Sequence, residues 1–165
     1  MRELKGKSLI EIPNKYIAFD IETTGFSSTK NNITEIGAVK IKDKKIIDRF
    51  STFVNPGEKI PEKIVELTRI TDEMVQDADP IDVVLPKFLD FIGSAPVVAH
   101  NANFDTGFIR VNAERQKLKF NPIIIDTLNL SRLLFTELKK HKLNIVAEHL
   151  GVSLEGHHRA VNDAE

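Results

Sequence analysis

Three consecutive segments near the start of the chain look like β-strands, and two of them are joined by a very short link. Residues 16–21 form a short apolar run, and residues 33–41 and 45–54 form two longer strand-like segments. Only residues 42–44, Lys-Asp-Lys, separate the second segment from the third. Two strands with so short a polar link are expected to pair as an antiparallel hairpin. The chain therefore begins as a predicted meander, onto which its later elements are added.

After residue 55 the sequence alternates between helical and strand-like segments. Short helices are predicted at residues 62–68 and 72–76, and short strands at residues 97–99 and 123–125. Three further helices are indicated by apolar residues at helical spacing. Their stripes are Val84, Leu85, Phe88, Leu89 and Ile92; Phe104, Phe108 and Val111; and Leu143, Val146, Ala147 and Leu150.

Capping residues predict where some of these helices begin and end. Asn103 and Asp126 follow the two short strands and are the predicted N-caps, and Gly151 is the predicted stop of the last helix. A β-meander followed by alternating helices and strands predicts an α/β fold. Its five strands would form one mixed sheet, part antiparallel meander and part parallel, flanked by helices.

Size and composition exclude several classes of protein. The chain has 165 residues, enough for one domain, and a net charge of −1. Proteins that bind a long stretch of duplex DNA are usually basic, so the net charge argues against a long DNA footprint. It does not argue against an enzyme that binds a few terminal nucleotides. No apolar run approaches the roughly 20 residues needed to cross a bilayer, which argues against a membrane protein. The chain has no cysteine, which fits a cytoplasmic location and excludes thiolate metal sites.

The first polar cluster lies at the end of the first predicted strand. Asp20 and Glu22 are two residues apart, so on a strand their side chains project from the same face. Carboxylates so close repel each other unless a cation or a proton compensates. A hard cation with oxygen ligands, Mg²⁺ or Mn²⁺, would satisfy both. The alternative is an exposed strand end with two solvated acids.

The second and third clusters contain the other chemically active side chains. Asp105 follows the short strand at 97–99 and lies in the predicted first turn of a helix, where the helix dipole alone would favour an acid. His100, at the same strand end, is either a polar cap or a contact to substrate. In the third cluster, His158 precedes Asp163 by five residues. His157 stands next to it, and a solvated polar loop is the alternative for this segment.

Taken together, the clusters suit one reaction. They offer four carboxylates for two divalent cations, and a histidine that can accept a proton near neutral pH, since its ordinary pKa is about 6.5. That set fits two-metal hydrolysis of a phosphodiester. Two of the clusters lie at the ends of predicted strands, so we expect the sheet to bring them together.

The clusters, in order, resemble the motifs of the DEDDh group of 3′→5′ exonucleases, which are DnaQ-like members of the ribonuclease H-like superfamily. Phe-Asp-Ile-Glu-Thr-Thr-Gly at 19–25 looks like the first motif, and His-Asn-Ala-Asn-Phe-Asp at 100–105 looks like the second. Residues 158–163 look like the third. The likeness is strongest to the proofreading exonuclease domains of PolC-type bacterial DNA polymerase III, and residues 46–48, 66–72 and 125–128 support it.

The resemblance implies a ribonuclease H-like fold and a role for each motif residue. It implies an enzyme that hydrolyses the terminal phosphodiester of single-stranded DNA 3′ ends, in proofreading or repair, and releases nucleoside monophosphates. Two Mg²⁺ or Mn²⁺ ions would be bound by the four acids, and a histidine would be the general base. These residues are Asp20, Glu22, Asp105 and Asp163 for the metal ions, and His158 for the base.

The resemblance also implies which residues touch the substrate. Thr23 and Phe26 match positions at the terminal nucleotide, and Phe104 matches a position near the penultimate base. Aromatic rings suit this role, because stacking on a base tolerates any sequence. For Phe104, packing in the core is the alternative.

The resemblance begins at about residue 16, so residues 1–14 are expected to be a loosely attached lead-in and residues 15–165 the exonuclease domain. In the family a helix continues beyond the position of Asp163, so the resemblance implies either a longer native chain or a domain without that helix. The segment Gly6-Lys7-Ser8-Leu9-Ile10 resembles the start of free-standing exonucleases of this type. We therefore favour a free-standing enzyme or a small subunit.

Three alternatives remain at this point. The same site would serve an RNA 3′-exonuclease, since the preference for ribose depends on how the pocket meets the 2′-hydroxyl. A polymerase-associated proofreading subunit would carry the same motifs. A binding module that has lost catalysis is the third, and the presence of all five motif residues argues against it.

Overall fold

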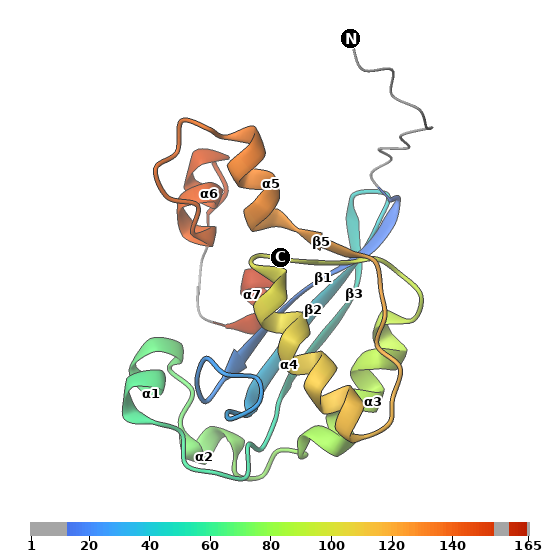
Figure 1. The fold of residues 1–165 in the computed structure, drawn as a ribbon, viewed down its shortest axis with the longest axis vertical. Coiled ribbons are helices and arrows are strands. Elements are labelled where there is room, and N and C mark those ends of the chain that lie inside the picture. The colour runs from blue at the N-terminus through green and yellow to red at the C-terminus, as the bar shows by residue number, and fades with distance from the viewer. Residues whose placement is uncertain (1–12, 154–158, 165) are drawn as a thin grey trace.

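The computed structural model describes residues 13–153 and 159–164. Within these ranges five strands form one mixed sheet in the order β3-β2-β1-β4-β5 (Figure 1). The predicted α/β fold with a mixed five-stranded sheet is therefore confirmed. The strands are β1 Lys15–Thr23, β2 Ile33–Lys42, β3 Lys45–Phe53, β4 Val97–Ala99 and β5 Ile124–Asp126.

The predicted hairpin is formed by β2 and β3, which pair antiparallel from Lys42–Lys45 to Glu35–Phe53. Asp43 and Lys44 make its turn, with φ angles of 50° and 63°. Positive φ at both residues matches the right-handed twist of the flanking strands. Strand β1 pairs antiparallel with β2, while β4 runs parallel to both β1 and β5. The carboxyl ends of β1, β4 and β5 therefore lie at the same edge of the sheet.

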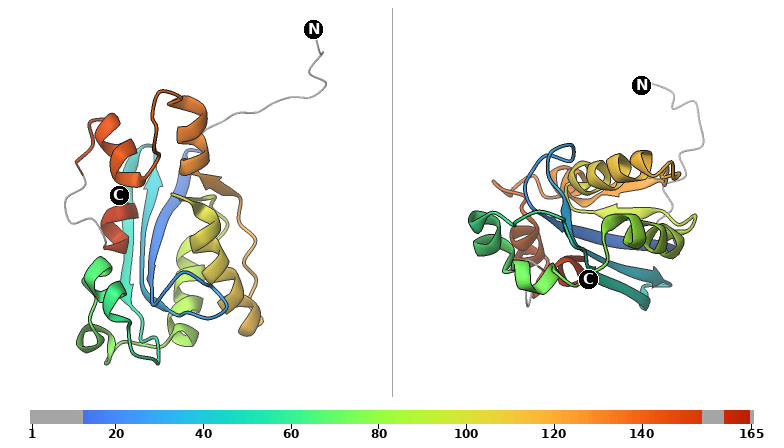
Figure 2. Two further views of the ribbon diagram at one scale, coloured as in Figure 1. Left: turned by 60° about the vertical axis from the view of Figure 1, so that its left-hand side comes forward. Right: turned by 90° about the horizontal axis from the view of Figure 1, so that it is seen from below.

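Seven helices accompany the sheet in the described residues. Their bounds are α1 Glu62–Thr68, α2 Asp72–Val75, α3 Ile81–Ile92, α4 Ala102–Arg115, α5 Thr127–Leu134, α6 Leu143–His149 and α7 Ala160–Ala164. Helices α3 and α4 lie on one face of the sheet and α7 on the other, as the two views of Figure 2 show. None of the described helices is both long enough and apolar enough to span a bilayer.

Both faces of the sheet are covered because alternate residues of its central strands pack on different helices. Ile17, Phe19 and Ile21 of β1 join the main core with residues of α3 and α4. On the other face, Val39 and Ile41 of β2 pack with Ala164 of α7. This explains why β2 is buried along nearly its whole length. The side chains of Asp20 and Glu22, between the core residues of β1, point to the face covered by α7.

Several predicted boundaries are confirmed, and others are corrected. Asp126 is the N-cap of α5, because its side chain accepts hydrogen bonds from the N–H groups of Leu128 and Asn129. The prediction that Asn103 caps α4 was wrong. Asn101, with a φ of 67°, holds the cap position, and the helix begins one residue later. Leu150 lies just beyond α6 and is 58% exposed, so it is not part of a buried stripe.

Candidate active site

The first and third sequence clusters meet at the carboxyl end of β1. One carboxylate oxygen each from Asp20, Glu22 and Asp163 lies within 4.8 Å of the other two. Asp20 and Glu22 share a face of β1, and Asp163 comes from α7, which packs on that face. Asp20 and Asp163, which are 143 positions apart in the sequence, thus form with Glu22 a group that could hold a metal ion.

The second cluster reaches the same place from the opposite face of the sheet. Asp105 lies in the first turn of α4, and its side chain is 2% exposed. Its Oδ1 accepts a hydrogen bond of 3.2 Å from the backbone N–H of Ile21. Ile21 stands between Asp20 and Glu22, so this bond fixes Asp105 beside the other acids. The three clusters converge as the sequence predicted.

Burial raises the pKa values of three acids of the site. The pKa of Glu22 is raised to about 8, first by burial and then by the nearby carboxylate of Asp163. Burial also raises the pKa of Asp105 to about 7, although hydrogen bonds from its own N–H and that of Ile21 oppose the shift. The pKa of Asp20 is well above its usual range because of burial and then the charge of Asp105. A divalent cation bound among these acids would favour their ionised forms and so oppose these shifts.

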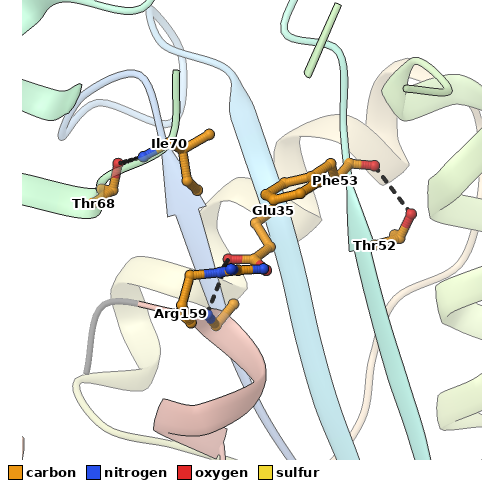
Figure 3. Close-up of polar contacts among 7 residues, drawn as sticks. Glu35, Thr52, Phe53, Thr68, Ile70 and Arg159 are labelled. Atoms are coloured by element: carbon orange, nitrogen blue, oxygen red, sulfur yellow. Dashed lines mark hydrogen bonds and ion pairs between the residues drawn. The ribbon is translucent and has the colours of Figure 1, made fainter. Parts of the chain in front are cut away.

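An ion pair between Arg159 and a buried carboxylate holds the segment that carries Asp163 against the sheet (Figure 3). Glu35 of β2 has a side chain that is only 1% exposed. The guanidinium of Arg159 donates to it from Nη2 at 2.9 Å and from Nε at 3.2 Å, and the N–H of Ala160 donates at 3.1 Å. Arg159 also lies over the ring of Phe53, 5.1 Å from its centroid. The start of α7 is thereby fixed four residues before Asp163.

Gly37 of β2 provides the space that α7 occupies. A Cβ at this position would overlap backbone atoms of Ala160 and Val161. Backbone cannot move aside as a flexible side chain could, so the close approach requires glycine. Glu35 and Gly37 are two residues apart and face the same side. Together they determine where Asp163 lies.

His100 is placed between β4 and α4, and both of its ring nitrogens have partners. Nδ1 lies 3.0 Å from the hydroxyl of Thr127, and Nε2 lies 2.7 Å from the backbone carbonyl of His141. His100 also lines a hollow of about 260 Å³ with Asp20 and Asp163. Its contact to substrate stays a prediction, and its structural role is to join three segments beside the acids.

The predicted substrate-binding residues differ in burial. Phe26 is 78% exposed on the loop after β1, so core packing does not explain it. The ring of Phe104 is half-buried and lies 5.1 Å from that of Phe108, so core packing accounts for part of its role. Thr23 is buried, and its hydroxyl donates to the carbonyl of Gly25 at 2.6 Å. Their contacts to a nucleotide stay predictions.

Other predictions fall on residues outside the described ranges. They concern the general base His158, its neighbour His157, and most of the predicted lead-in, residues 1–12.

The comparisons with known proteins match nearly the whole chain. The model of the RNase T exonuclease family matches residues 17–165. The chain belongs to the RNase T exonuclease family. By family membership it is a 3′→5′ exonuclease of the DEDDh type, and its mixed five-stranded sheet agrees with that family. The recognition made from the three motifs is confirmed.

Curated relatives of this exonuclease chain are much longer proteins. It is 58% identical over 153 residues to DNA polymerase III PolC-type of Clostridium perfringens, covering 92% of this chain and 10% of the relative. It is 51% identical over 160 residues to the PolC-type polymerase of Caldanaerobacter subterraneus, covering 97% and 11%. The chain thus spans about a tenth of the length of these relatives, in their exonuclease region.

Solved exonuclease structures share its architecture. Exonuclease X in complex with 5′ overhanging duplex DNA matches with a TM-score of 0.70 and 31% identity, covering 91% of this chain and 83% of that one. The nuclease domain of 3′hExo, a DEDDh family member bound to rAMP, matches with a TM-score of 0.76 and 22% identity, covering 92% and 86%. Escherichia coli exonuclease I with a dT13 oligonucleotide matches at 0.81 and 14%, covering 92% and 39%. The last two likenesses concern the fold.

The sequence reasoning missed Glu35, Gly37 and the role of Arg159, for which it considered solvation in a polar loop as the alternative. One signal was available for Glu35, since an acid in the middle of the strand Ile-Thr-Glu-Ile-Gly-Ala-Val needs a buried partner. No local pattern identifies that partner, because it stands 124 residues away.

Proposed function

We propose that this chain is a metal-dependent 3′→5′ exonuclease that releases nucleoside monophosphates from single-stranded DNA ends. The observation that carries the proposal is the convergence of four acids. Asp20, Glu22 and Asp163 lie within 4.8 Å of one another, and Asp105 is hydrogen-bonded to the backbone between the first two. Arg159 lowers the pKa of Glu22, but burial and the neighbouring carboxylates outweigh it.

The four acids fit two divalent cations, Mg²⁺ or Mn²⁺. Such hard cations take oxygen ligands, and burial together with mutual repulsion raises the pKa values of three of these carboxyls, so a cation would stabilise their ionised forms. When bound, the ions would activate a water and stabilise the leaving oxygen. The carboxylates of β1, α4 and α7 would orient that chemistry, and the surrounding burial would keep bulk water away.

His158 is proposed as the general base. It precedes Asp163 by five residues, and Arg159 fixes the chain between the two at Glu35. A neutral imidazole would accept the proton of the attacking water. We expect His158→Gln to lose turnover and to keep metal binding. A variant that retains full turnover between about pH 6 and 8 would rule out this role.

The exposed ring of Phe26 supports a contact with the terminal nucleotide, together with Thr23 and His100. Phe104, which is half-buried beside Phe108, would lie near the penultimate base. Stacking on these rings would hold a frayed end without reading its sequence.

DNA is the proposed substrate because Exonuclease X, at 31% identity, was solved with DNA. RNA is the second candidate, since the DEDDh domain of 3′hExo has a similar fold and was solved with rAMP. Digestion of matched DNA and RNA oligonucleotides by the same preparation would decide between them. Equal or faster digestion of RNA would overturn the DNA assignment.

The PolC-type relatives support a role in proofreading, either as part of a polymerase or as a subunit associated with one. A free-standing repair enzyme is the alternative. Co-purification with a polymerase would support the first role. Residues 15–165 as the catalytic domain and a cytoplasmic location stay predictions.

The test of the proposed activity is release of mononucleotides from a single strand with Mg²⁺. The 5′-labelled strand should shorten one nucleotide at a time from its 3′ end. Asp20→Asn should abolish the release, whereas Asp90→Asn, at an exposed position of α3, should leave it unchanged. Full activity of the Asp20 variant would overturn the assignment of the site.

A further inference from the structure

The segment between α5 and α6 is basic and lines a hollow of about 600 Å³. Lys139, Lys140 and Lys142 lie in this segment, and Arg132 lies in the last turn of α5. All four residues are exposed. The whole chain has a net charge of −1, so four cations around one hollow are a local concentration of positive charge.

This basic segment is fixed to the sheet. The imidazole of His100, at the end of β4, lies 2.7 Å from the carbonyl of His141 through Nε2. The Nδ1 atom of His141 lies 3.2 Å from the hydroxyl oxygen of Ser131, which is buried in α5. The lysines on either side of His141 are therefore presented at a defined place on the surface.

The basic hollow adjoins the acidic site. His100 lines it, and the same residue lines the hollow that contains Asp20 and Asp163. A strand whose 3′ end lies at the acids could therefore continue past His100 along the basic segment. This order suits a polyanion, whose terminal phosphate meets the metal site while its upstream phosphates meet cations.

The nearby acids do not neutralise these four cations. In the described residues, Glu137 forms its ion pair with His149, at 3.2 Å. Asp126 accepts hydrogen bonds from the N–H groups of Asn101, Leu128 and Asn129. Among the ion pairs of the described ranges, none involves Arg132 or the three lysines. Their charge is available to a ligand.

We propose that this basic hollow binds the phosphodiester groups of the substrate strand upstream of the bond that is cut. The inference rests on the proposed exonuclease function and adds a second anchoring point to it. The cations would neutralise backbone phosphates without reading bases, so binding would be independent of sequence and sensitive to salt.

The experiment compares two triple variants of the full chain, K139A/K140A/K142A and the control K42A/K44A/K45A. Both lose three positive charges. The control residues are exposed at the β2–β3 turn. This turn lies far from the acids, because Lys42 pairs with Lys15 at the start of β1 and Glu22 lies near its end. Each protein is assayed on a 20-nucleotide single strand and on the p-nitrophenyl ester of thymidine 5′-monophosphate, which is too small to reach the hollow.

For the hollow variant we expect the KM for the oligonucleotide to rise about tenfold, and its salt dependence to weaken by about two powers, since three phosphate contacts are lost. Hydrolysis of the ester should stay within about twofold of the unmodified chain, because removing phosphate contacts leaves the chemistry intact. The control should behave as the unmodified chain on both substrates. The charge-retaining K139R/K140R/K142R should restore the KM.

An unchanged KM of the hollow variant would overturn the proposal, as would an equal rise in the control, which would indicate long-range charge alone. Loss of ester hydrolysis by the hollow variant would also overturn it, because the segment would then act on the acids. If the triple variant does not fold, Lys140→Ala alone must still raise the KM. An unmodified chain that is inactive on both substrates would instead refute the proposed function.

Discussion

The guanidinium of Arg159 donates hydrogen bonds of 2.9 and 3.2 Å to the buried carboxylate of Glu35, across 124 positions of the sequence. Glu35 stands on β2 opposite Glu22 of β1, and it is not one of the three acids grouped at the candidate metal site. It nevertheless determines where α7 begins, and Asp163 is in the first turn of that helix. The position of one proposed metal ligand thus depends on Glu35, a residue outside the three motifs.

The first prediction concerns Glu35→Gln. Glutamine keeps the shape but loses the charge that orients Arg159, so we expect turnover to fall about 10- to 100-fold, with a higher Mn²⁺ requirement. Titration of activity with Mn²⁺ measures both. Glu66→Gln, at an exposed position of α1, is the control. If saturating Mn²⁺ leaves the variant as impaired as low Mn²⁺ does, positioning of a metal ligand is not the reason for its defect.

The second prediction is that replacing Arg159, the other member of the ion pair, reduces stability more than replacing Glu35 does. Arg159→Met leaves the carboxylate of Glu35 buried and, among the described residues, hydrogen-bonded by the N–H of Ala160. We expect the free energy of unfolding to drop by about 1–3 kcal/mol, more than for Glu35→Gln, because a buried acceptor loses its charged partner. Urea denaturation of both variants gives the comparison. A smaller loss for the Arg159 variant would contradict this account.

The third prediction concerns Gly37→Ala. The new methyl group would overlap the backbone of Ala160 and Val161, so α7 must move away from β2. Displacing a catalytic group by about 1 Å can cost a hundredfold in rate, and we expect a loss of that order. Gly107→Ala in α4 is the control, because its Cβ would come no closer than 3.8 Å to the hydroxyl of Ser28. Equal activity of the two variants would disprove the role of Gly37.

Stability of the metal-free protein should depend on pH in an unusual direction. Glu22 and Asp105 have folded pKa values of about 8 and about 7, whereas the unfolded values lie near 4. The folded state therefore holds protons that the unfolded state has released, and stability falls as pH rises from about 4 to about 8. Thermal unfolding in EDTA should show a lower Tm at pH 8 than at pH 6. Mn²⁺ should raise the Tm more at pH 8, and a Tm that rises with pH in EDTA would contradict the site.

The fifth prediction separates activity from stability at Asp105. Asp105→Asn keeps an oxygen that can accept from the N–H of Ile21 but removes a buried charge. We expect turnover to be lost while the metal-free Tm at pH 8 increases, since repulsion with Asp20 is relieved. Asp82→Asn, exposed on α3, should change neither. A lower Tm of the Asp105 variant would show that its carboxylate is structural.

Local sequence patterns were sufficient for most of the fold. The short polar link at residues 42–44 determined the β2–β3 hairpin, since strands so close in sequence can pair only antiparallel. The side chain of Asp126 predicted the start of α5, because capping is a contact within a few residues. The prediction that Asn103 caps α4 failed because a cap also depends on backbone conformation. The chain adopts the positive φ of the cap position at Asn101.

The sequence by itself also selected the candidate residues for the chemistry. Asp20 and Glu22 are two apart on a strand, and Asp105 and Asp163 stand in ordered motifs, so residue type and spacing were enough to select them. Only the tertiary structure decided how they meet. On one face of the sheet, the N–H of Ile21 donates a hydrogen bond to Asp105. On the other face, Glu35 accepts a hydrogen bond from the start of α7, and Gly37 leaves the space that α7 occupies. These contacts join segments more than 80 residues apart, and no periodicity along the chain encodes a partner at that distance.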